Sequence, residues 1–204
     1  MSSVRISVLV LLCVNISLFI SLSISAPVFA GSTNESSLSN MLESISQKIL
    51  SKEKIEGNFI QHKHIHLLPQ PLLSTGYFSF DVNKELIWST ITPIKSEMVF
   101  DDNGVRQKQN GMVIWEADKN QPGISHLGEI VRAILGTDWS TLRSHFSIMG
   151  SIHENQWHLM LTPKNEAIKN NILGIALSGE QYLNAMKIME KDDNHTDITF
   201  TVTP

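Results

Sequence analysis

Hydrophobic residues near position 40 recur with the spacing of one face of a helix. They follow an i, i+3, i+4, i+7, i+11 series with polar residues between them, which predicts an amphipathic helix over residues 37–50. Ser36 and Ser37 precede the first apolar position, and either is suited to cap the helix. The apolar residues of this series are Leu38, Met41, Leu42, Ile45 and Ile49.

From position 55 the pattern changes to alternation of apolar and polar residues, which is typical of β-strands. Strands are predicted at residues 55–61, 76–80, 85–90, 97–100, 105–109, 112–116, 146–153, 156–162, 172–178, 182–190 and 196–203. Asn103-Gly104 and Asn110-Gly111 favour tight turns between strands, because these residues accept positive φ angles. Helical patterns return at residues 127–135 and 140–146. These elements predict a mainly β, α+β fold: a curved antiparallel sheet, or incomplete β-barrel, with helices on one face.

Several predicted strands are apolar on both of their faces. Phe78 and Phe80 alternate with Tyr77, and Leu86 and Trp88 alternate with Ile87. A sheet with one wet face would alternate more cleanly. Two interpretations remain open: a sandwich buried on both sides, or a sheet whose concave face lines a hydrophobic pocket.

The first thirty residues have the pattern of a secretory leader. Arg5 precedes a largely apolar run at residues 6–24. The stretch from Pro27 to Ala30 then places residues that signal peptidase accepts at the −3 and −1 positions, which predicts cleavage after Ala30. An uncleaved anchor is the alternative. Residues 31–204 then form a single secreted domain. Cys13, the one cysteine, falls in the leader, so we expect no disulfide and no thiol chemistry in the mature chain.

Charge and motifs exclude several classes of function. Loss of Arg5 leaves 15 basic against 20 acidic residues, a net charge of −5, which argues against nucleic acid and against anionic membrane surfaces as partners. The chain has no nucleophile elbow, phosphate-binding loop or dinucleotide fingerprint. His153 and His158 are one residue too far apart for a zinc-protease motif. We therefore expect neither catalysis nor a cofactor.

Short motifs in a fixed order resemble those of the LolA-type outer-membrane lipoprotein carriers. Phe59-Ile60-Gln61 is similar to the family's Phe-x-Gln, and residues 76–80 to the Gly-x-hydrophobic strand that follows it. Trp88 and Pro93 have the family's strand–Trp–Pro spacing. Residues 98–104, 159–163 and 198–200 continue the match, which runs through most of residues 38–203.

The resemblance implies a fold, a task and a set of partners. The fold is an incomplete antiparallel barrel with an apolar interior and a helical lid, here residues 37–50 and 127–146. The task is to carry acylated lipoproteins through the periplasm, as a monomer, from an inner-membrane exporter to an outer-membrane receptor. A different acyl lipid or a glycolipid is the alternative cargo. The lid residues would be Leu38, Met41, Leu42, Ile45, Ile130 and Ile134.

An acyl chain offers only methylene groups, so its binding site needs bulky apolar side chains and little polar precision. The same residue types also build an ordinary protein core. The candidates for acyl-chain binding are Phe59, Phe78, Phe80, Trp88, Met98, Phe100, Met112, Ile114 and Trp115.

One position departs from the family pattern. LolA-type carriers commonly have a basic residue six positions after the glycine that corresponds to Gly76, where it is held to latch the lid. Here that position is Val82. The latch is therefore either an apolar contact of Val82 or a substitute formed by Lys84, which shares a strand face with it.

The segment His62-Lys63-His64-Ile65-His66 suggests an alternative class of function. Residues two apart on a strand share a face, so the three imidazoles would project together about 6.7 Å apart. Two of them can ligate Zn²⁺ or Cu²⁺ with help from a neighbouring strand, which would indicate a metal-binding or regulatory sensor module. The carrier hypothesis instead expects a solvated strand end without a metal.

Overall fold

The computed structural model describes residues 35–49, 53–118 and 125–203, except for the side chains of residues 125–127. The leader predicted at residues 1–30 lies outside this part. The described helices are α2 (Glu35–Lys48), α3 (Ser125–Leu135), α4 (Trp139–His145) and α5 (Glu166–Lys169). The strands are β1 (Lys54–His64), β2 (Leu72–Asp81), β3 (Leu86–Thr92), β4 (Ser96–Asp101), β5 (Gly104–Gln109), β6 (Met112–Asp118), β7 (Phe146–His153), β8 (Gln156–Pro163), β9 (Ile172–Gly179), β10 (Leu183–Glu190) and β11 (His195–Val202).

All the strands form one antiparallel sheet in the order β6-β5-β4-β3-β2-β1-β11-β10-β9-β8-β7. Consecutive strands pair as hairpins within each half, and the halves meet where β1 pairs with β11, with Phe59 opposite Phe200 and His64 opposite His195. The first and last strands of the sheet are therefore central. Its edges, β6 and β7, are joined in sequence by the segment that contains α3 and α4.

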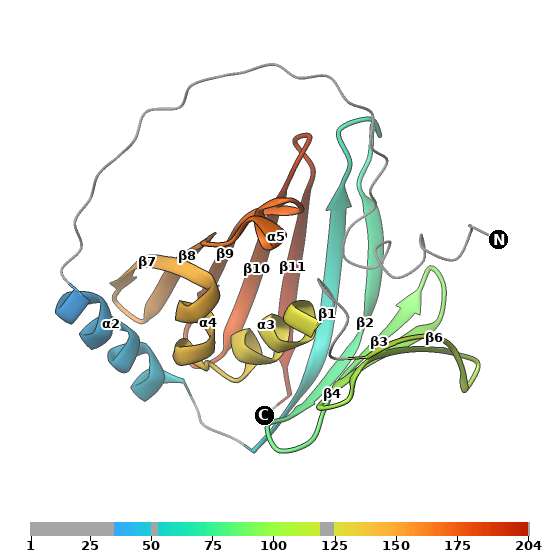
Figure 1. Cartoon of the computed structure of the whole chain (residues 1–204), viewed down its shortest axis with the longest axis horizontal. Helices are drawn as coiled ribbons and strands as arrows, with labels where there is room; N and C mark the ends of the chain where they lie inside the picture. Colours follow the sequence, from blue (N-terminus) through green and yellow to red (C-terminus); the bar gives the residue numbers. More distant parts are fainter. Residues whose placement is uncertain (1–34, 50–52, 119–124, 204) are drawn as a thin grey trace.

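The sheet is curved and stays open (Figure 1). Helix α3 contacts β4 and β5, while α2 and α4 contact β7, so the helices occupy the concave face between the two edges. This placement keeps β6 and β7 apart. The expected curved sheet with a helical cover is confirmed, whereas a description of the fold as a β-barrel is wrong.

Burial alternates along the central strands and defines two faces. On β1 Gly57, Phe59 and Gln61 are buried under the helices, while Asn58 and Ile60 are exposed on the opposite face. Tyr77 of β2 is exposed on that opposite face as well. The sandwich interpretation is therefore wrong, since the second apolar face of these strands is not covered by another sheet.

The periodic segments of the sequence match the observed elements, with shifts at their ends. Strands β1 and β2 are longer than predicted because their ladder continues as far as the pair Lys63–Leu72. Helix α5 was not predicted, because a single turn is too short to show a helical period. Its N-cap is Asn165, whose side-chain oxygen accepts a hydrogen bond from the Ile168 N–H at 2.9 Å. None of the described helices is long and apolar enough to cross a membrane.

Candidate functional site

The concave face of the sheet carries a floor of aromatic side chains. Phe59 stacks on Trp88 with ring centroids 4.0 Å apart, and Phe200 meets Trp88 edge-on at 6.0 Å. These rings come from β1, β3 and β11: the pairing of β1 with β11 makes these two strands neighbours, and β3 is separated from β1 by β2 alone. Six of the candidate acyl-binding residues are buried on this face: Phe59, Phe78, Phe80, Trp88, Met98 and Phe100.

Phe200 belongs to the same floor but was not among the predicted site residues. It packs edge-on against Phe78 at 5.5 Å as well as against Trp88. The alternation in residues 198–200 indicated a buried position. Its neighbours, however, follow only from the pairing of the last strand with the first.

The other three candidates lie at the edge of the sheet, on β6. Met112 is 67% exposed and Ile114 45% exposed, so the structure does not bring them into the buried floor. Trp115 is half-buried and packs against the core. An irregularity in the β5–β6 register, between the pairs Gln107–Trp115 and Lys108–Val113, separates the two groups. Because of this irregularity, alternation does not run unbroken through positions 112–116.

The predicted lid residues lie between the helices and the sheet. Leu42 and Ile45 of α2 and Ile130 and Ile134 of α3 are buried. Leu38 and Met41 of α2 are partly buried against the same core.

Two glycines let α3 lie directly on the aromatic floor. A Cβ at Gly128 would stand 3.3 Å from Phe100 Cδ1, and one at Gly136 would stand 3.2 Å from Phe80 Cζ. A small space beside the end of α3, lined by residues that include Ile134, Trp157 and Phe200, has a volume of about 20 Å³. The described conformation is therefore closed over the floor.

A larger cleft opens to solvent beside α3, with a volume of about 500 Å³. Its apolar wall includes Phe80, Val105 and Ala133. Its remaining lining includes Val82, Asp101, Asp102, Glu129, Arg132 and Asp138. The cleft thus connects a buried phenyl ring of the floor with a charged rim.

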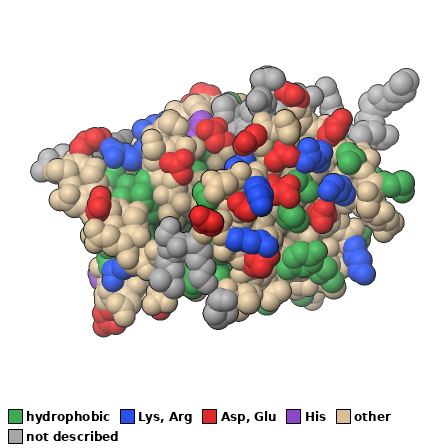
Figure 2. All heavy atoms as spheres, turned by 90° about the horizontal axis from the view of Figure 1, so that it is seen from below, with side chains coloured by type: hydrophobic (Ala, Val, Ile, Leu, Met, Phe, Trp, Pro, Cys, Tyr) green, Lys and Arg blue, Asp and Glu red, His purple; other side chains and the backbone are tan. Residues whose placement is uncertain are grey.

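Hydrogen bonds keep part of this rim ionised. Partial burial raises the pKa of Asp101, but the Asn103 N–H and the Arg106 guanidinium outweigh burial, and the net pKa lies below its ordinary value. Asp138 caps α4 by accepting hydrogen bonds from Thr141 N at 3.1 Å and Thr141 Oγ1 at 2.7 Å, and the latter bond is the main reason why the pKa of Asp138 is lowered. The face seen from below in Figure 2 mixes acidic and basic side chains without a large area of one sign.

Neither residue considered for the latch bonds to a helix end in the described structure. Val82 is 48% exposed beside the cleft. Lys84 is exposed, and its ammonium group lies 3.5 Å from Asp81 Oδ2. The ion pair that joins a helix to the sheet here is formed by a residue of α3: Arg132 Nη1 lies 3.0 Å from Oδ1 of Asp102, which follows β4.

Contacts between helices add to this cover. Trp139 Nε1 donates to Ser46 Oγ at 2.6 Å, which joins α4 to α2. The Arg143 guanidinium lies 3.0 Å from Glu35 Oε2 and joins the same two helices. His145 Nε2 of α4 lies 3.3 Å from Glu129 Oε2 of α3. Helices α2, α4 and α3 thus form a connected layer on the concave face of the sheet.

The structure does not bring the three histidines of the row His62, His64 and His66 together. His62 and His64 are half-buried on the face opposite the helices, whereas His66 lies beyond the end of β1. His64 stacks instead on His195 of β11, with ring centroids 4.2 Å apart. Burial and the charge of Lys187 lower the pKa of His195. Sequence reasoning missed His195, although its alternation with Asp197 repeats the spacing of the histidine row.

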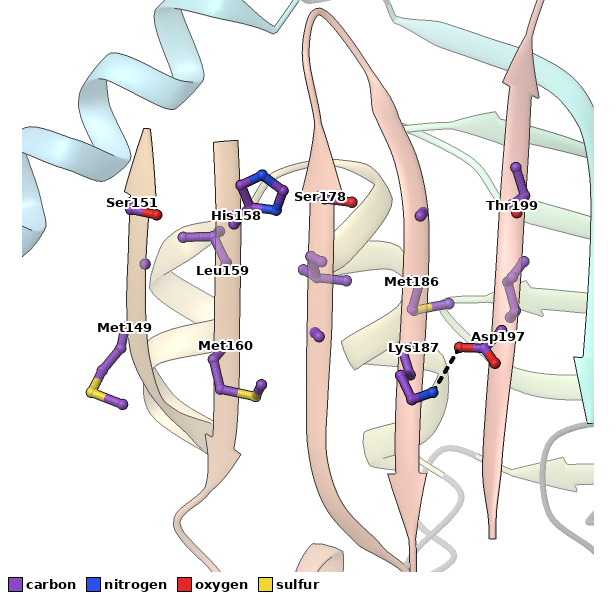
Figure 3. A pocket seen from close by; sticks show the side chains of 15 residues that line it. Met149, Ser151, His158, Leu159, Met160, Ser178, Met186, Lys187, Asp197 and Thr199 are labelled. Carbon is purple, nitrogen blue, oxygen red and sulfur yellow. Dashed lines mark ion pairs between the residues drawn. The ribbon is translucent and has the colours of Figure 1, made fainter. Parts of the chain in front are cut away.

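A shallow groove of about 510 Å³ lies on the helix-free face of the sheet (Figure 3). Met149 and Met160 project into it, and the helices lie behind the strands in this view. Lys187 and Asp197 mark its end near β11, where Lys187 Nζ lies 3.2 Å from Asp197 Oδ1. The groove is separated from the aromatic floor by the sheet itself.

The fold and the floor define a class of protein: an open, curved antiparallel sheet whose apolar concave face is covered by helices. The chain belongs to the LolA family, because the family model described as outer membrane lipoprotein carrier protein LolA matches residues 51–203. The resemblance found in the sequence motifs is thereby confirmed.

The solved structures that match this chain are distant from it in sequence. The LolA superfamily protein NE2245 from Nitrosomonas europaea is 7% identical, with 80% of this chain and 90% of that chain covered and a TM-score of 0.44. The Pseudomonas aeruginosa MucA/MucB complex gives 13% identity and a TM-score of 0.45, and the match covers 81% of this chain and 56% of that chain. The Mycobacterium tuberculosis lipoprotein LppX is 8% identical, with 79% and 94% covered and a TM-score of 0.40. No curated protein matches the chain significantly.

Proposed function

We propose that the protein is a periplasmic carrier that binds acyl chains between the concave face of the sheet and helices α2, α3 and α4. The cargo is a lipoprotein or another acyl lipid, received from an inner-membrane exporter and delivered to an outer-membrane receptor. Residues 31–204 act as one carrier domain after removal of the leader. The observation that supports the proposal most directly is the buried aromatic floor that includes Phe59, Trp88 and Phe200.

The energetics of an acyl chain suit such a floor. Burying sixteen methylene groups contributes roughly 12 kcal/mol at ~0.8 kcal/mol each, before the cost of ordering the chain. No polar group is needed along that length. Phenyl and indole faces provide the required apolar area.

Cargo binding requires the helical cover to move. Sites for small ligands enclose about 300–1,000 Å³, whereas the small space beside the end of α3 is about 20 Å³. Displacing α3 would join that space to the cleft of about 500 Å³ beside it, because Ile134 of α3 lines the small space and Ala133 of the same helix lines the cleft. We infer that α3 is the moving part of the lid and that the cleft is the entrance.

A charged residue in the cleft wall tests the binding site. We expect the delipidated protein to bind a fluorescent apolar probe that palmitate displaces. Phe80→Glu should weaken probe binding about tenfold or more, because it places a carboxylate at the entrance. The measurement is a fluorescence titration beside a melting curve of each variant.

The control for this test is Tyr77→Glu, on the same strand but on the exposed opposite face. Equal probe affinity in both variants would show that the probe binds elsewhere. Lipid extraction from protein isolated from its own host, followed by mass spectrometry, would then identify the cargo.

The contact that closes the lid can be tested separately. Arg132→Gln should accelerate amide exchange in residues 128–135 by up to about fivefold, because an exposed ion pair contributes roughly 0–1 kcal/mol. Lys84→Gln should leave exchange unchanged, since Lys84 pairs with Asp81 and not with the helix. Hydrogen exchange followed by mass spectrometry measures both. If Lys84→Gln accelerates exchange in residues 128–135 and Arg132→Gln does not, Lys84 and not Arg132 holds the lid closed.

A further inference from the structure

Three side chains with metal-binding atoms meet on the helix-free face where β1 ends and β11 begins. His64 and His195 are direct cross-strand partners, and Asp197 lies two residues further along β11. The Nε2 atoms of His64 and His195 lie 3.5 and 3.4 Å from the same carboxylate oxygen, Asp197 Oδ2. One ligand atom from each residue lies within 4.8 Å of the other two.

These separations are long for hydrogen bonds but suit ligands of one ion. A hydrogen bond between nitrogen and oxygen spans about 2.7–3.2 Å. Ligand atoms placed tetrahedrally around Zn²⁺ at about 2.0–2.1 Å stand roughly 3.3–3.4 Å apart. The two nitrogen–oxygen distances therefore match two edges of a zinc tetrahedron, and the stacked imidazole rings, only 10° from parallel, would turn so that both nitrogens face one ion.

The carboxylate is held in the orientation that such a site needs. Lys187 Nζ lies 3.2 Å from Asp197 Oδ1, which leaves Oδ2 directed at the two imidazoles. Partners of this kind commonly orient metal ligands. Two residues after His64, the His66 N–H donates a hydrogen bond to Asn194 Oδ1 at 2.9 Å. This bond holds the end of β1 beside the β10–β11 turn. All three ligand side chains are partly exposed, so an ion can reach them.

We propose that His64, His195 and Asp197 form a binding site for Zn²⁺, with water in the fourth position. Two imidazoles and one carboxylate are a donor set typical of zinc, and Cu²⁺ fits the same set. The positive charge of Lys187 repels the bound Zn²⁺. The affinity of the site for zinc is therefore moderate, with a Kd on the order of 1 µM. The ion joins the end of β1 to the start of β11.

The site has a structural role that is separate from cargo binding. It lies across the sheet from the aromatic floor, at the base of the β1–β2 connection. That connection carries two exposed leucines, Leu67 at 81% and Leu68 at 44%. Zinc would fix this connection relative to the β10–β11 hairpin, because it links the two strands from which they project.

Calorimetric titration of the tag-free, chelator-treated protein with ZnCl₂ tests the site. We expect one ion per chain and a rise in melting temperature on zinc addition. His195→Ala and Asp197→Ala should each weaken binding at least about tenfold and remove the thermal shift. The controls His62→Ala, on the same strand and face as His64, and His158→Ala, beside the groove of Figure 3, should bind as the wild type does.

Either of two titration results would overturn the proposal. One is the absence of saturable binding to the wild-type protein. The other is binding that survives His195→Ala but is lost in His62→Ala, which would assign zinc to the histidine row of β1. Electron paramagnetic resonance of the wild-type protein with Cu²⁺ needs no variant, so it does not depend on how the variants fold. We expect hyperfine splitting from two imidazole nitrogens, and its absence would contradict the site.

Discussion

Oxidation of the double variant Phe100→Cys/Gly128→Cys is expected to abolish binding of an apolar probe, and reduction is expected to restore it. A Cβ at Gly128 would lie 3.9 Å from Phe100 Cβ. Disulfides have a mean Cβ–Cβ distance of about 3.8 Å. The bond would therefore fix α3 on β4 in the closed conformation, in which the small space beside the end of α3 holds about 20 Å³.

The two redox states of this variant provide their own comparison. Probe titrations of one sample before and after reduction differ only in whether α3 is free to move. The native cysteine, Cys13 in the leader, is replaced by serine so that it forms no other disulfide. The single variants Phe100→Cys and Gly128→Cys control for the lost phenyl ring and for the added side chain. If the oxidised double variant binds the probe as the reduced one does, α3 does not gate the site and the proposed entrance is wrong.

Gly76→Ala is expected to destabilise the protein by about 3 kcal/mol, at the upper end for overpacked sites. A Cβ at this position would lie 1.9 Å from the Ser89 carbonyl oxygen and 2.8 Å from Phe59 Cζ. Gly76 and Phe59 are cross-strand partners, so the Phe59 ring lies over the bare glycine on its way to Trp88. The methyl group would displace the ring from its stack and push the strands apart.

Thermal and urea denaturation measure this effect. A loss of 3 kcal/mol corresponds to a fall in melting temperature of about 10 °C for a chain of this size. The matched control is Gly111→Asn, because nothing lies within 4 Å of a Cβ there and asparagine tolerates the positive φ of 78°. That variant should stay within about 1 kcal/mol of the wild type. A Gly76→Ala protein that melts with the wild type would mean that β2 and β3 can separate at no cost.

Local pattern was sufficient for the strands, the longer helices and the inward direction of most aromatic side chains. Strand β7 begins and ends at the predicted residues, Phe146 and His153, because alternation and its interruption are properties of neighbouring positions. Phe59, Phe78 and Phe80 face the helices for the same reason. The spacing of Gly76, Trp88 and Pro93 also indicated the family, which the match over residues 51–203 confirms.

Local pattern located β6 but did not show which of its side chains are buried, because that depends on the tertiary structure. Met112 and Ile114 are bulky and apolar like the residues of a buried strand, yet they lie at the start of an edge strand with an irregular register and stay exposed. Whether a strand is central or at an edge depends on which strands pair, and periodicity carries no information about that choice.

The sequence by itself determined a curved, helix-covered sheet of the LolA family with an aromatic inner face. Only the tertiary structure placed β11 beside β1, which completes the floor with Phe200 and sets His195 and Asp197 against His64. It also shows a contact from Arg132 to Asp102 beside Val82, where the sequence left the latch open between Val82 and Lys84. The physical reason is the same in each case: these contacts join residues far apart in the chain, and their geometry is fixed by strand pairing and helix docking, which local periodicity does not encode.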